Sequence, residues 1–237
     1  MTERTELVEL MASAIKERTS LPPLPKDLSL SEAYEIQASL VEAVSGGALA
    51  GYKAGVTAPA GQKQFGIDHP LIGALYDYGR LQSGASIASG PGVSLECEIG
   101  LVIRSDGTAK SAGPVIEVPR MAWADSGDAT GANLAACNIA ADRFIVGEQA
   151  DVLEDYGDID VTLTRDGETV TSANLNEALG GPLSALEWMV KTAQELGYTF
   201  DEDMLMITGA LGGIHLANMG TYVADYGPLG QVTFTVT

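Results

Sequence analysis

The sequence is short of cysteine and of basic residues, and it contains no long apolar run. Its two cysteines, Cys97 and Cys137, give no support to a disulfide framework or a cysteine zinc site. Thirteen Lys and Arg against 32 Asp and Glu leave a net charge of −19, which disfavours nucleic acid and anionic membranes as partners. No segment reaches the ~18 apolar residues of a membrane span, and the charged start has no signal-peptide core. We therefore expect a soluble, cytoplasmic protein.

Several familiar catalytic motifs are also missing. No Gly-x-Gly-x-x-Gly follows a strand, and no P-loop is present, so nucleotide binding of those two kinds finds no support. No Gly-x-Ser-x-Gly elbow occurs, and neither His69 nor His215 has a clear nucleophile partner, so Ser–His–Asp hydrolysis is disfavoured. Strand and helix patterns do not alternate regularly, which argues against a Rossmann sheet.

Many short strands, frequent glycines and few helices predict an α+β fold that is mostly β, with peripheral helices. Apolar periodicity predicts helices over residues 5–18, from Ser29 to Gly46 and over 183–196, the second beginning at a Ser29–Glu32 capping box. The alanine-rich residues 131–142 also favour a helix. Residues 158–172 predict a hairpin with its turn at Asp166-Gly167. We expect residues 1–50 to form an N-terminal helical cap and residues 51–237 the main domain.

The segment Ser94–Ile103 is the most informative stretch of the chain. It has the composition of a buried strand, yet Glu96 and Glu98 stand two residues apart and so point to the same face. Two neighbouring carboxylates are unfavourable unless a cation lies between them. Spacing alone favours at least equally a simpler interpretation, in which both acids lie on the solvent face of an edge strand.

Glu117 is a second isolated charge in an apolar run, Pro114–Val118. Three carboxylates, Glu96, Glu98 and Glu117, would suit the oxygen ligation that Mg²⁺ or Mn²⁺ prefers, and they disfavour zinc. Lys53, between glycines, is a candidate to pair with a substrate carboxylate or to pass a proton, although a surface lysine is the commoner case. A tight connection is likewise the simpler explanation for the glycine-rich residues 208–213.

Several short motifs follow one another in a definite order. They are Leu28–Gln37, Gly51–Gly55, Phe65–Pro70, Glu96–Glu98, Val115–Val118, Arg143–Gly147 and Thr208–Leu211. The ordered set, spread over nearly the whole chain, resembles the 2-keto-4-pentenoate hydratase and 2-oxo-acid decarboxylase branch of the fumarylacetoacetate hydrolase superfamily.

The resemblance implies a fumarylacetoacetase C-terminal-like fold, a mixed β-sandwich or roll, and a homo-oligomer. It implies that Glu96, Glu98 and Glu117 hold a divalent metal, Mg²⁺ or Mn²⁺, and that Lys53 is the catalytic lysine. The substrates implied are short 2-oxo acids, usually from the breakdown of aromatic compounds. The metal would act as a Lewis acid on the 2-oxo group, while Lys53 neutralises the substrate carboxylate or passes a proton.

Three positions depart from the family pattern. Leu71 stands where hydratases commonly carry an acid after the proline, Cys137-Asn138 replaces Asp-Asn, and Thr208 replaces a serine while keeping the hydroxyl. We expect Lys53, Leu71 and Thr208 to contact the substrate, and Trp123 and Ile72 to line an apolar side of the pocket. A lyase that hydrates a substrate such as 2-hydroxypenta-2,4-dienoate is the leading hypothesis. Alternatives are a 4-oxalocrotonate-type decarboxylase, an acylpyruvate hydrolase and a non-catalytic binder of 2-oxo acids.

Overall fold

The computed structural model describes residues 3–237, and it is rich in strands. The helices are α1 (Glu3–Lys16), α2 (Leu30–Ser45), α3 (Pro59–Phe65), α4 (Gly131–Ala136) and α5 (Pro182–Glu195). The strands are β1 (Leu49–Gly55), β2 (Leu71–Tyr76), β3 (Arg80–Gln82), β4 (Ala85–Ile87), β5 (Ser94–Ile103), β6 (Ala109–Val118), β7 (Arg143–Val146), β8 (Asp160–Arg165), β9 (Glu168–Asn174), β10 (Leu205–Ile207), β11 (Leu211–Leu216), β12 (Gly220–Asp225) and β13 (Gln231–Val236).

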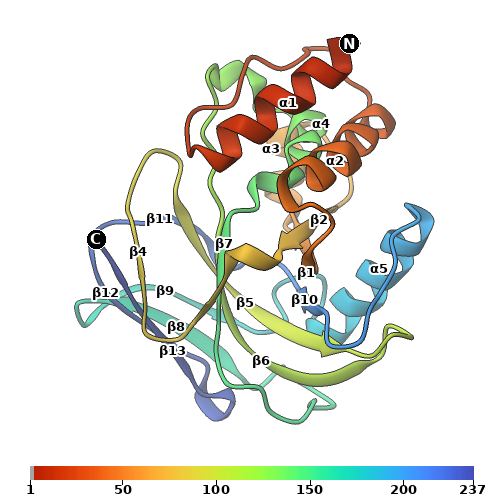
Figure 1. The fold of residues 1–237 in the computed structure, drawn as a ribbon. Coiled ribbons are helices and arrows are strands. Elements are labelled where there is room, and N and C mark those ends of the chain that lie inside the picture. Colours follow the sequence, from red (N-terminus) through yellow and green to blue (C-terminus); the bar gives the residue numbers. More distant parts are fainter. Residues whose placement is uncertain (1–2) are drawn as a thin grey trace.

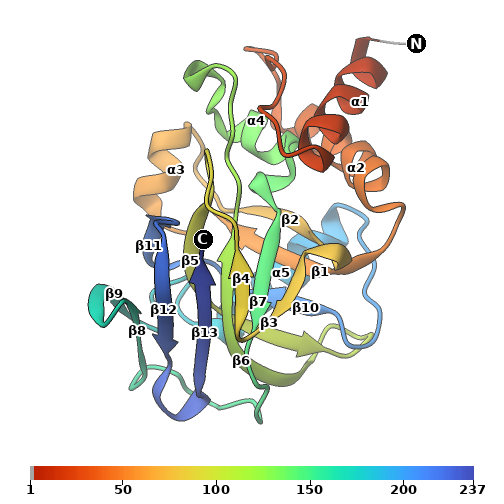
Figure 2. The same cartoon turned by 60° about the vertical axis from the view of Figure 1, so that its left-hand side comes forward.

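The strands form two sheets that share one large core. The larger sheet has the order β2-β1-β10-β5-β6-β7-β3, with β11 also paired to β5, and the smaller has the order β4-β13-β12-β8-β9. Long, curved β5 and β6 cross the middle of the molecule (Figure 1), and β13 lies between β4 and β12 in the smaller sheet (Figure 2). Apolar side chains of both sheets meet in this core. The predicted mostly-β α+β fold is confirmed.

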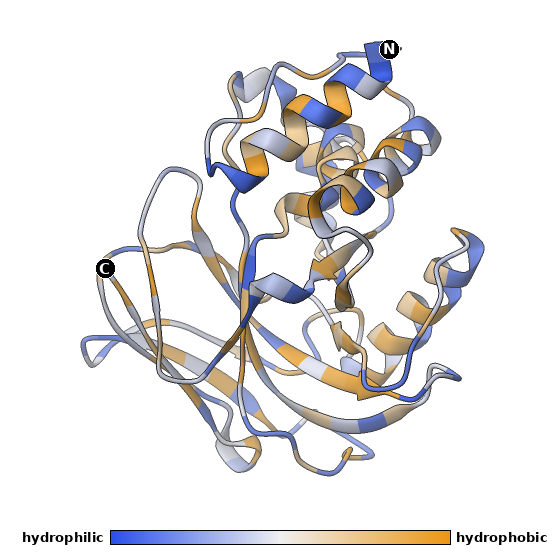
Figure 3. Cartoon of the chain, viewed as in Figure 1, coloured by the Kyte–Doolittle hydropathy of each residue, from blue (hydrophilic) through white to orange (hydrophobic). Residues whose placement is uncertain are grey.

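The N-terminal helices lie together with α4 at one end of the molecule (Figure 1). Apolar and polar residues alternate along α1 and α2 (Figure 3), and the apolar ones join a second core cluster that includes residues of β2 and α4. The predicted capping box of α2 is confirmed, since the Ser29 hydroxyl accepts from Glu32 N–H and the Glu32 carboxylate accepts from Ser29 N–H.

A buried amide side chain helps to join this helical end to the sheet. Gln37 of α2 is fully buried, and its Nε2 donates to Ile72 O at 3.1 Å and to Ala135 O at 2.8 Å. Its Oε1 accepts a hydrogen bond from the Tyr198 hydroxyl at 2.5 Å. The division at residues 50 and 51 stays a prediction, and these bonds run across it.

Two further sequence expectations are confirmed. The hairpin of β8 and β9 turns at Asp166 and Gly167, which have φ values of 51° and 86°. Helix α5 has a proline at its first turn, and Gly197 follows it with φ 76°. None of the helices in residues 3–237 combines the length and apolar character needed to cross a bilayer.

The expected helix over 131–142 is wrong beyond its first half. Helix α4 ends at Ala136, and a tight turn over Asn138–Ala140 follows with φ values of 55°, 51° and 56°. Three consecutive left-handed residues with side chains are costly. The side chain of Asn138 compensates through two hydrogen bonds to the backbone of Ala74. Its Oδ1 accepts from Ala74 N–H at 2.7 Å, and its Nδ2 donates to Ala74 O at 2.9 Å. Tertiary hydrogen bonding has therefore overruled the helix propensity of the alanines.

Candidate active site

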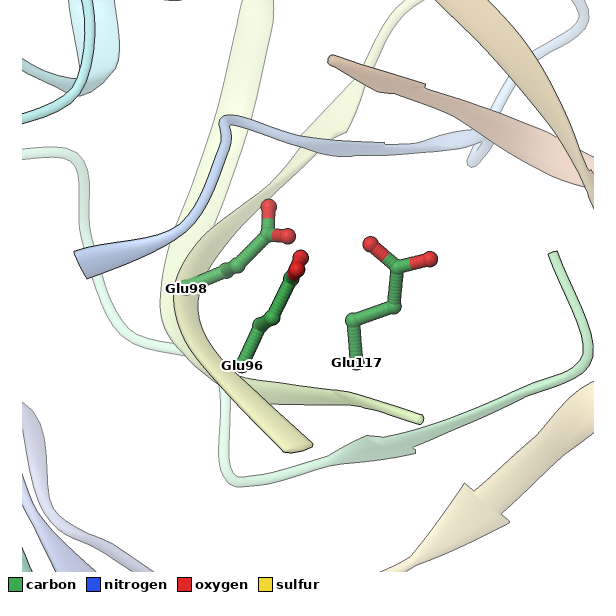
Figure 4. Close-up of side chains that lie close together, drawn as sticks. All are labelled: Glu96, Glu98 and Glu117. Carbon is green, nitrogen blue, oxygen red and sulfur yellow. The ribbon is translucent and has the colours of Figure 1, made fainter. Parts of the chain in front are cut away.

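Glu96, Glu98 and Glu117 lie side by side in the interior of the larger sheet. Strand β5 has β10 and β11 on one side and β6 on the other, so the edge-strand interpretation of its acids is wrong. Glu96 is directly opposite Glu117 in the β5–β6 pairing, and Glu98 projects from the same face of β5 as Glu96. Figure 4 shows the three carboxyl groups gathered together, and each offers an oxygen within 4.8 Å of the others.

Two of these carboxylates have oxygens that nothing in residues 3–237 satisfies. Glu98 Oε1 and Glu117 Oε2 have no hydrogen-bond partner, and solvent cannot supply one because the two residues are only 0% and 1% exposed. Such orphaned oxygens are costly unless a cation meets them. The donor set is made of carboxylate oxygens, which is the set that hard divalent cations prefer. The residues present therefore fit a divalent cation.

The second oxygen of Glu98 is held by the backbone. The glycine-rich turn connects β10 to β11, which pair with successive stretches of β5. Within this turn, Gly209 N–H donates to Glu98 Oε2 at 2.5 Å. Gly209 has φ 106°, and a Cβ there would clash with the methyl group of Thr57. Only glycine meets both requirements without strain, so this residue type follows from the orientation of Glu98.

Lys53 reaches the same acids from β1. Its side chain is 2% exposed, and Nζ donates to Glu117 Oε1 and, at 3.0 Å, to Ile139 O. The Ile139 carbonyl belongs to the left-handed turn, so the strained backbone supplies one of the two bonds that fix the lysine. Gly55 makes room for this turn, since a Cβ there would lie 2.6 Å from Ile139 Cγ2.

The charges of the site shift one another's protonation. Burial raises the pKa of Glu96 to about 8, with a further rise from Glu117 that Lys53 partly opposes. Burial also raises the pKa of Glu98 well above its ordinary value, and the neighbouring Glu117 and Glu96 add to this. Burial by itself would lower the pKa of Lys53, but the carboxylates, Glu117 foremost, outweigh it, so the pKa is raised. Lys53 is thus a cation at neutral pH, and the raised pKa values of Glu96 and Glu98 mean that three ionised carboxylates here need a further cation, which a metal ion would supply.

A cavity of about 300 Å³ opens beside these residues, and Lys53 and Glu96 form part of its wall. Pockets for small molecules start at about this volume. Segments far apart in the sequence contribute, from α3 and α4 to the turn after Thr208. The remaining wall is mostly apolar, and the lining includes Val56, Phe65, Met121, Leu134 and Ile214.

Comparison with known proteins assigns the chain. No family model matches the sequence. The 2-keto-4-pentenoate hydratase of Paraburkholderia phymatum is 31% identical over 263 residues, an alignment that covers 95% of this chain and 95% of that protein. The chain belongs to the 2-keto-4-pentenoate hydratase family. This confirms the branch predicted from the ordered motifs and, with it, an enzyme of the lyase class.

Relatives of this hydratase family include decarboxylases. The 4-oxalocrotonate decarboxylase of Pseudomonas putida is 25% identical, with 98% of this chain and 94% of that protein covered. The structure of the Pseudomonas putida G7 decarboxylase with calcium and acetate superposes with a TM-score of 0.88 at 21% identity, covering 100% of this chain and 99% of that one. At that identity the likeness confirms the fold.

Two of the residues expected to contact the substrate do not line the cavity. Leu71 is fully buried in the cluster beneath the N-terminal helices. Thr208 is 2% exposed, and its hydroxyl donates to Ile99 O at 3.1 Å. Ile72 is fully buried as well, and Trp123 packs on the N-terminal cluster. Leucine at 71 therefore serves packing, and the apolar wall comes from other residues.

Some residues of the site were not identified from the sequence. Gly209 lies next to Thr208 in the motif that was noted, so its glycine was the available signal. Tyr226 is fully buried, and its hydroxyl accepts from Glu98 N–H at 3.1 Å and donates to Val115 O at 2.8 Å, which ties β5 to β6 beside the acids. The cavity wall also includes Glu177, a carboxylate that no motif singled out.

Proposed function

We propose that the protein is a divalent-metal-dependent hydratase of a short 2-oxo acid or its 2-hydroxydienoic tautomer, such as 2-hydroxypenta-2,4-dienoate. The observation that carries the proposal is the combination of three clustered carboxylates and a buried lysine beside a cavity of substrate size. Membership of the hydratase family supports it. A small-molecule acid is the partner that this cavity suits.

Glu96, Glu98 and Glu117 would hold Mg²⁺ or Mn²⁺ through their carboxylate oxygens. A bound divalent cation supplies Lewis-acid polarisation of the substrate's 2-oxo group. Gly209 N–H keeps Glu98 turned toward its neighbours, and Tyr226 fixes the strand that carries it. Strand-borne ligands with fixed partners hold a site more firmly than loop residues do.

Lys53 would be the catalytic residue. Its Nζ is charged and held by Glu117 and Ile139 O, yet it forms part of the cavity wall. From there it would attract the substrate carboxylate and give a proton to C5 of the 2-hydroxydiene. The proton of the 2-hydroxyl group would leave to solvent, which gives the 2-oxo acid with its double bond between C3 and C4, and solvent would return a proton to Lys53. Water then adds across the remaining double bond, its oxygen to C4 and a proton to C3.

The experiment assays purified protein with Mg²⁺ or Mn²⁺ on two substrates, 2-hydroxypenta-2,4-dienoate and 4-oxalocrotonate, and follows CO₂ release. We expect turnover of the first to 4-hydroxy-2-oxopentanoate. Release of CO₂ from the second without turnover of the first would replace the hydratase by the decarboxylase, which the relatives and the fold also fit. Binding of metal and oxalate without turnover of either substrate would indicate a binding protein.

A further inference from the structure

The charges along the cavity are unevenly placed. Among the described residues, Lys53 is the one cationic side chain in the wall, and it is already bonded to Glu117. The other charged lining groups are two carboxylates, Glu96 and Glu177. A substrate therefore meets positive charge at one end alone, where Lys53 and the metal ligands lie.

Glu177 lies on the solvent-facing side of the cavity, since it is exposed whereas Lys53 is 2% exposed. It is exposed, in the connection between β9 and α5, and Gly212 N–H donates to its Oε1 at 3.4 Å. The same glycine-rich turn reaches Glu98 through Gly209 N–H. Three residues of chain span at most about 11 Å, so the backbone groups that hold Glu98 and Glu177 are no further apart than this.

Apolar groups fill the wall between these ends. Val56, Phe65 and Met121 come from separate segments, and Ile214 at the mouth is 47% exposed. An ionised group placed against such a wall loses hydration without gaining a partner, which is unfavourable. At the mouth, a second carboxylate would also meet the like charge of Glu177.

We propose that the cavity selects monocarboxylic 2-oxo acids with a short uncharged tail, and that Glu177 is a specificity residue that rejects a second carboxylate. The inference rests on the proposed function for the oxo-acid end and adds the chemistry of the far end. It places dicarboxylates such as 4-oxalocrotonate on the disfavoured side, and it gives Glu177 a task that the metal ligands and Lys53 do not share.

The test measures binding by calorimetry to the full-length protein saturated with Mg²⁺. Two stable acids of equal length serve as probes, 2-oxohexanoate with an apolar end and 2-oxoadipate with a second carboxylate. We expect wild type to favour 2-oxohexanoate by tenfold or more. Glu177→Gln should narrow that ratio by about two- to fivefold, mainly through tighter binding of 2-oxoadipate, as fits the removal of one rim charge. Raising the salt concentration should narrow the ratio of the two affinities in wild type, because salt screens the charge of Glu177, and should leave the ratio of the variant unchanged.

Glu187→Gln is the matched control, because it removes the same charge from an exposed position on α5 away from the cavity. It should leave the ratio unchanged. Equal binding of the two acids by wild type, or the same ratio in wild type and Glu177→Gln, would overturn the inference and leave the hydratase proposal standing. Failure of both acids to bind would remove the proposed function, and the inference with it.

Discussion

Lys53 is bonded to two segments of opposite construction. Strand β6 presents Glu117 from regular, fully paired sheet, whereas the turn at 138–140 presents the Ile139 carbonyl from three left-handed residues. The sheet is stabilised by its own ladder of hydrogen bonds, while the turn depends on Asn138 and its bonds to Ala74. Of the two segments, the carboxylates therefore lie on the less strained one, and the turn that positions the lysine carries the strain.

The largest effect is expected from removing the group that both segments hold. Lys53→Met should reduce turnover of 2-hydroxypenta-2,4-dienoate by about 10²- to 10⁴-fold, the usual contribution of a proton-transferring side chain. Calorimetry should show that Mg²⁺ still binds, because the carboxylates stay. Lys63→Met, at an exposed position of α3 outside the cavity, is the control and should keep full activity. Activity within tenfold of wild type would exclude Lys53 from catalysis.

On the sheet side, Glu98→Gln should weaken Mg²⁺ binding by at least about 100-fold, because it removes a charged ligand. Substitution of residues that only contact a ligand already costs up to about 100-fold in metal affinity. The amide carbonyl of the new side chain can still accept from Gly209 N–H, so the thermal midpoint of the metal-free protein should change little. Calorimetric titration with Mg²⁺ measures the first effect and scanning calorimetry the second. Unchanged Mg²⁺ affinity would remove Glu98 from the ligand set.

On the turn side, Asn138→Ala removes two buried hydrogen bonds and leaves Ala74 N–H and C=O unpaired. The free energy of unfolding should fall by about 2–4 kcal/mol, which urea unfolding measures. Exposed Asn218→Ala is the control and should stay within about 0.5 kcal/mol. A loss as small as that of the control would mean that the turn does not depend on Asn138.

The crowding of buried carboxyl groups on the sheet side should appear as a pH dependence of stability. In metal-free protein, folded Glu96 has a pKa of about 8 against the ordinary value of 4.5 for a glutamate, so between these values the folded state holds a proton that the unfolded state has lost. Stability should therefore fall as the pH rises from about 5 to 8. In calorimetric scans with a chelator, Glu96→Gln should flatten this fall, and an equal slope in both proteins would contradict it.

The smallest effect is expected when alanine is replaced by glycine, once in a helix and once in the left-handed turn. Ala135→Gly within α4 should cost about 0.5–1 kcal/mol, the usual penalty in a helix. At Ala140, with φ 56°, glycine relieves left-handed strain while adding unfolded-state entropy, so the two terms should cancel to within about 1 kcal/mol. Urea unfolding of both variants gives the difference. A larger loss at 140 than at 135 would show that the turn is not strained.

The contrast between sheet and turn also explains what the sequence could predict. Alternation along β5 put Glu96 and Glu98 on one face, and isolated Glu117 stood out in β6, because a strand's period of two can be read locally. The hairpin at Asp166 and the capping box at Ser29 depend on near neighbours too. Each of these expectations agrees with the structure.

The failures involve contacts between distant segments. Residues 137–142 look helical by composition, and the bonds between Asn138 and Ala74, 64 residues apart, decide otherwise. The substrate contacts expected of Leu71 and Thr208 stay predictions, since both side chains are buried and the Thr208 hydroxyl bonds to Ile99 O. Glu177 carried no local signal, because its position at the mouth depends on how the β9–α5 connection meets the turn at Gly212.

The buried amide of Gln37 has a consequence for how the molecule comes apart. One side chain of α2 carries bonds to β2, to α4 and to Tyr198, and α4 leads directly into the turn that holds Lys53. Unfolding of the first fifty residues would break these bonds. It would at the same time loosen the turn whose Ile139 carbonyl accepts from Lys53. The N-terminal helices therefore help to hold Lys53 in position, so shortening or replacing them would change the active site.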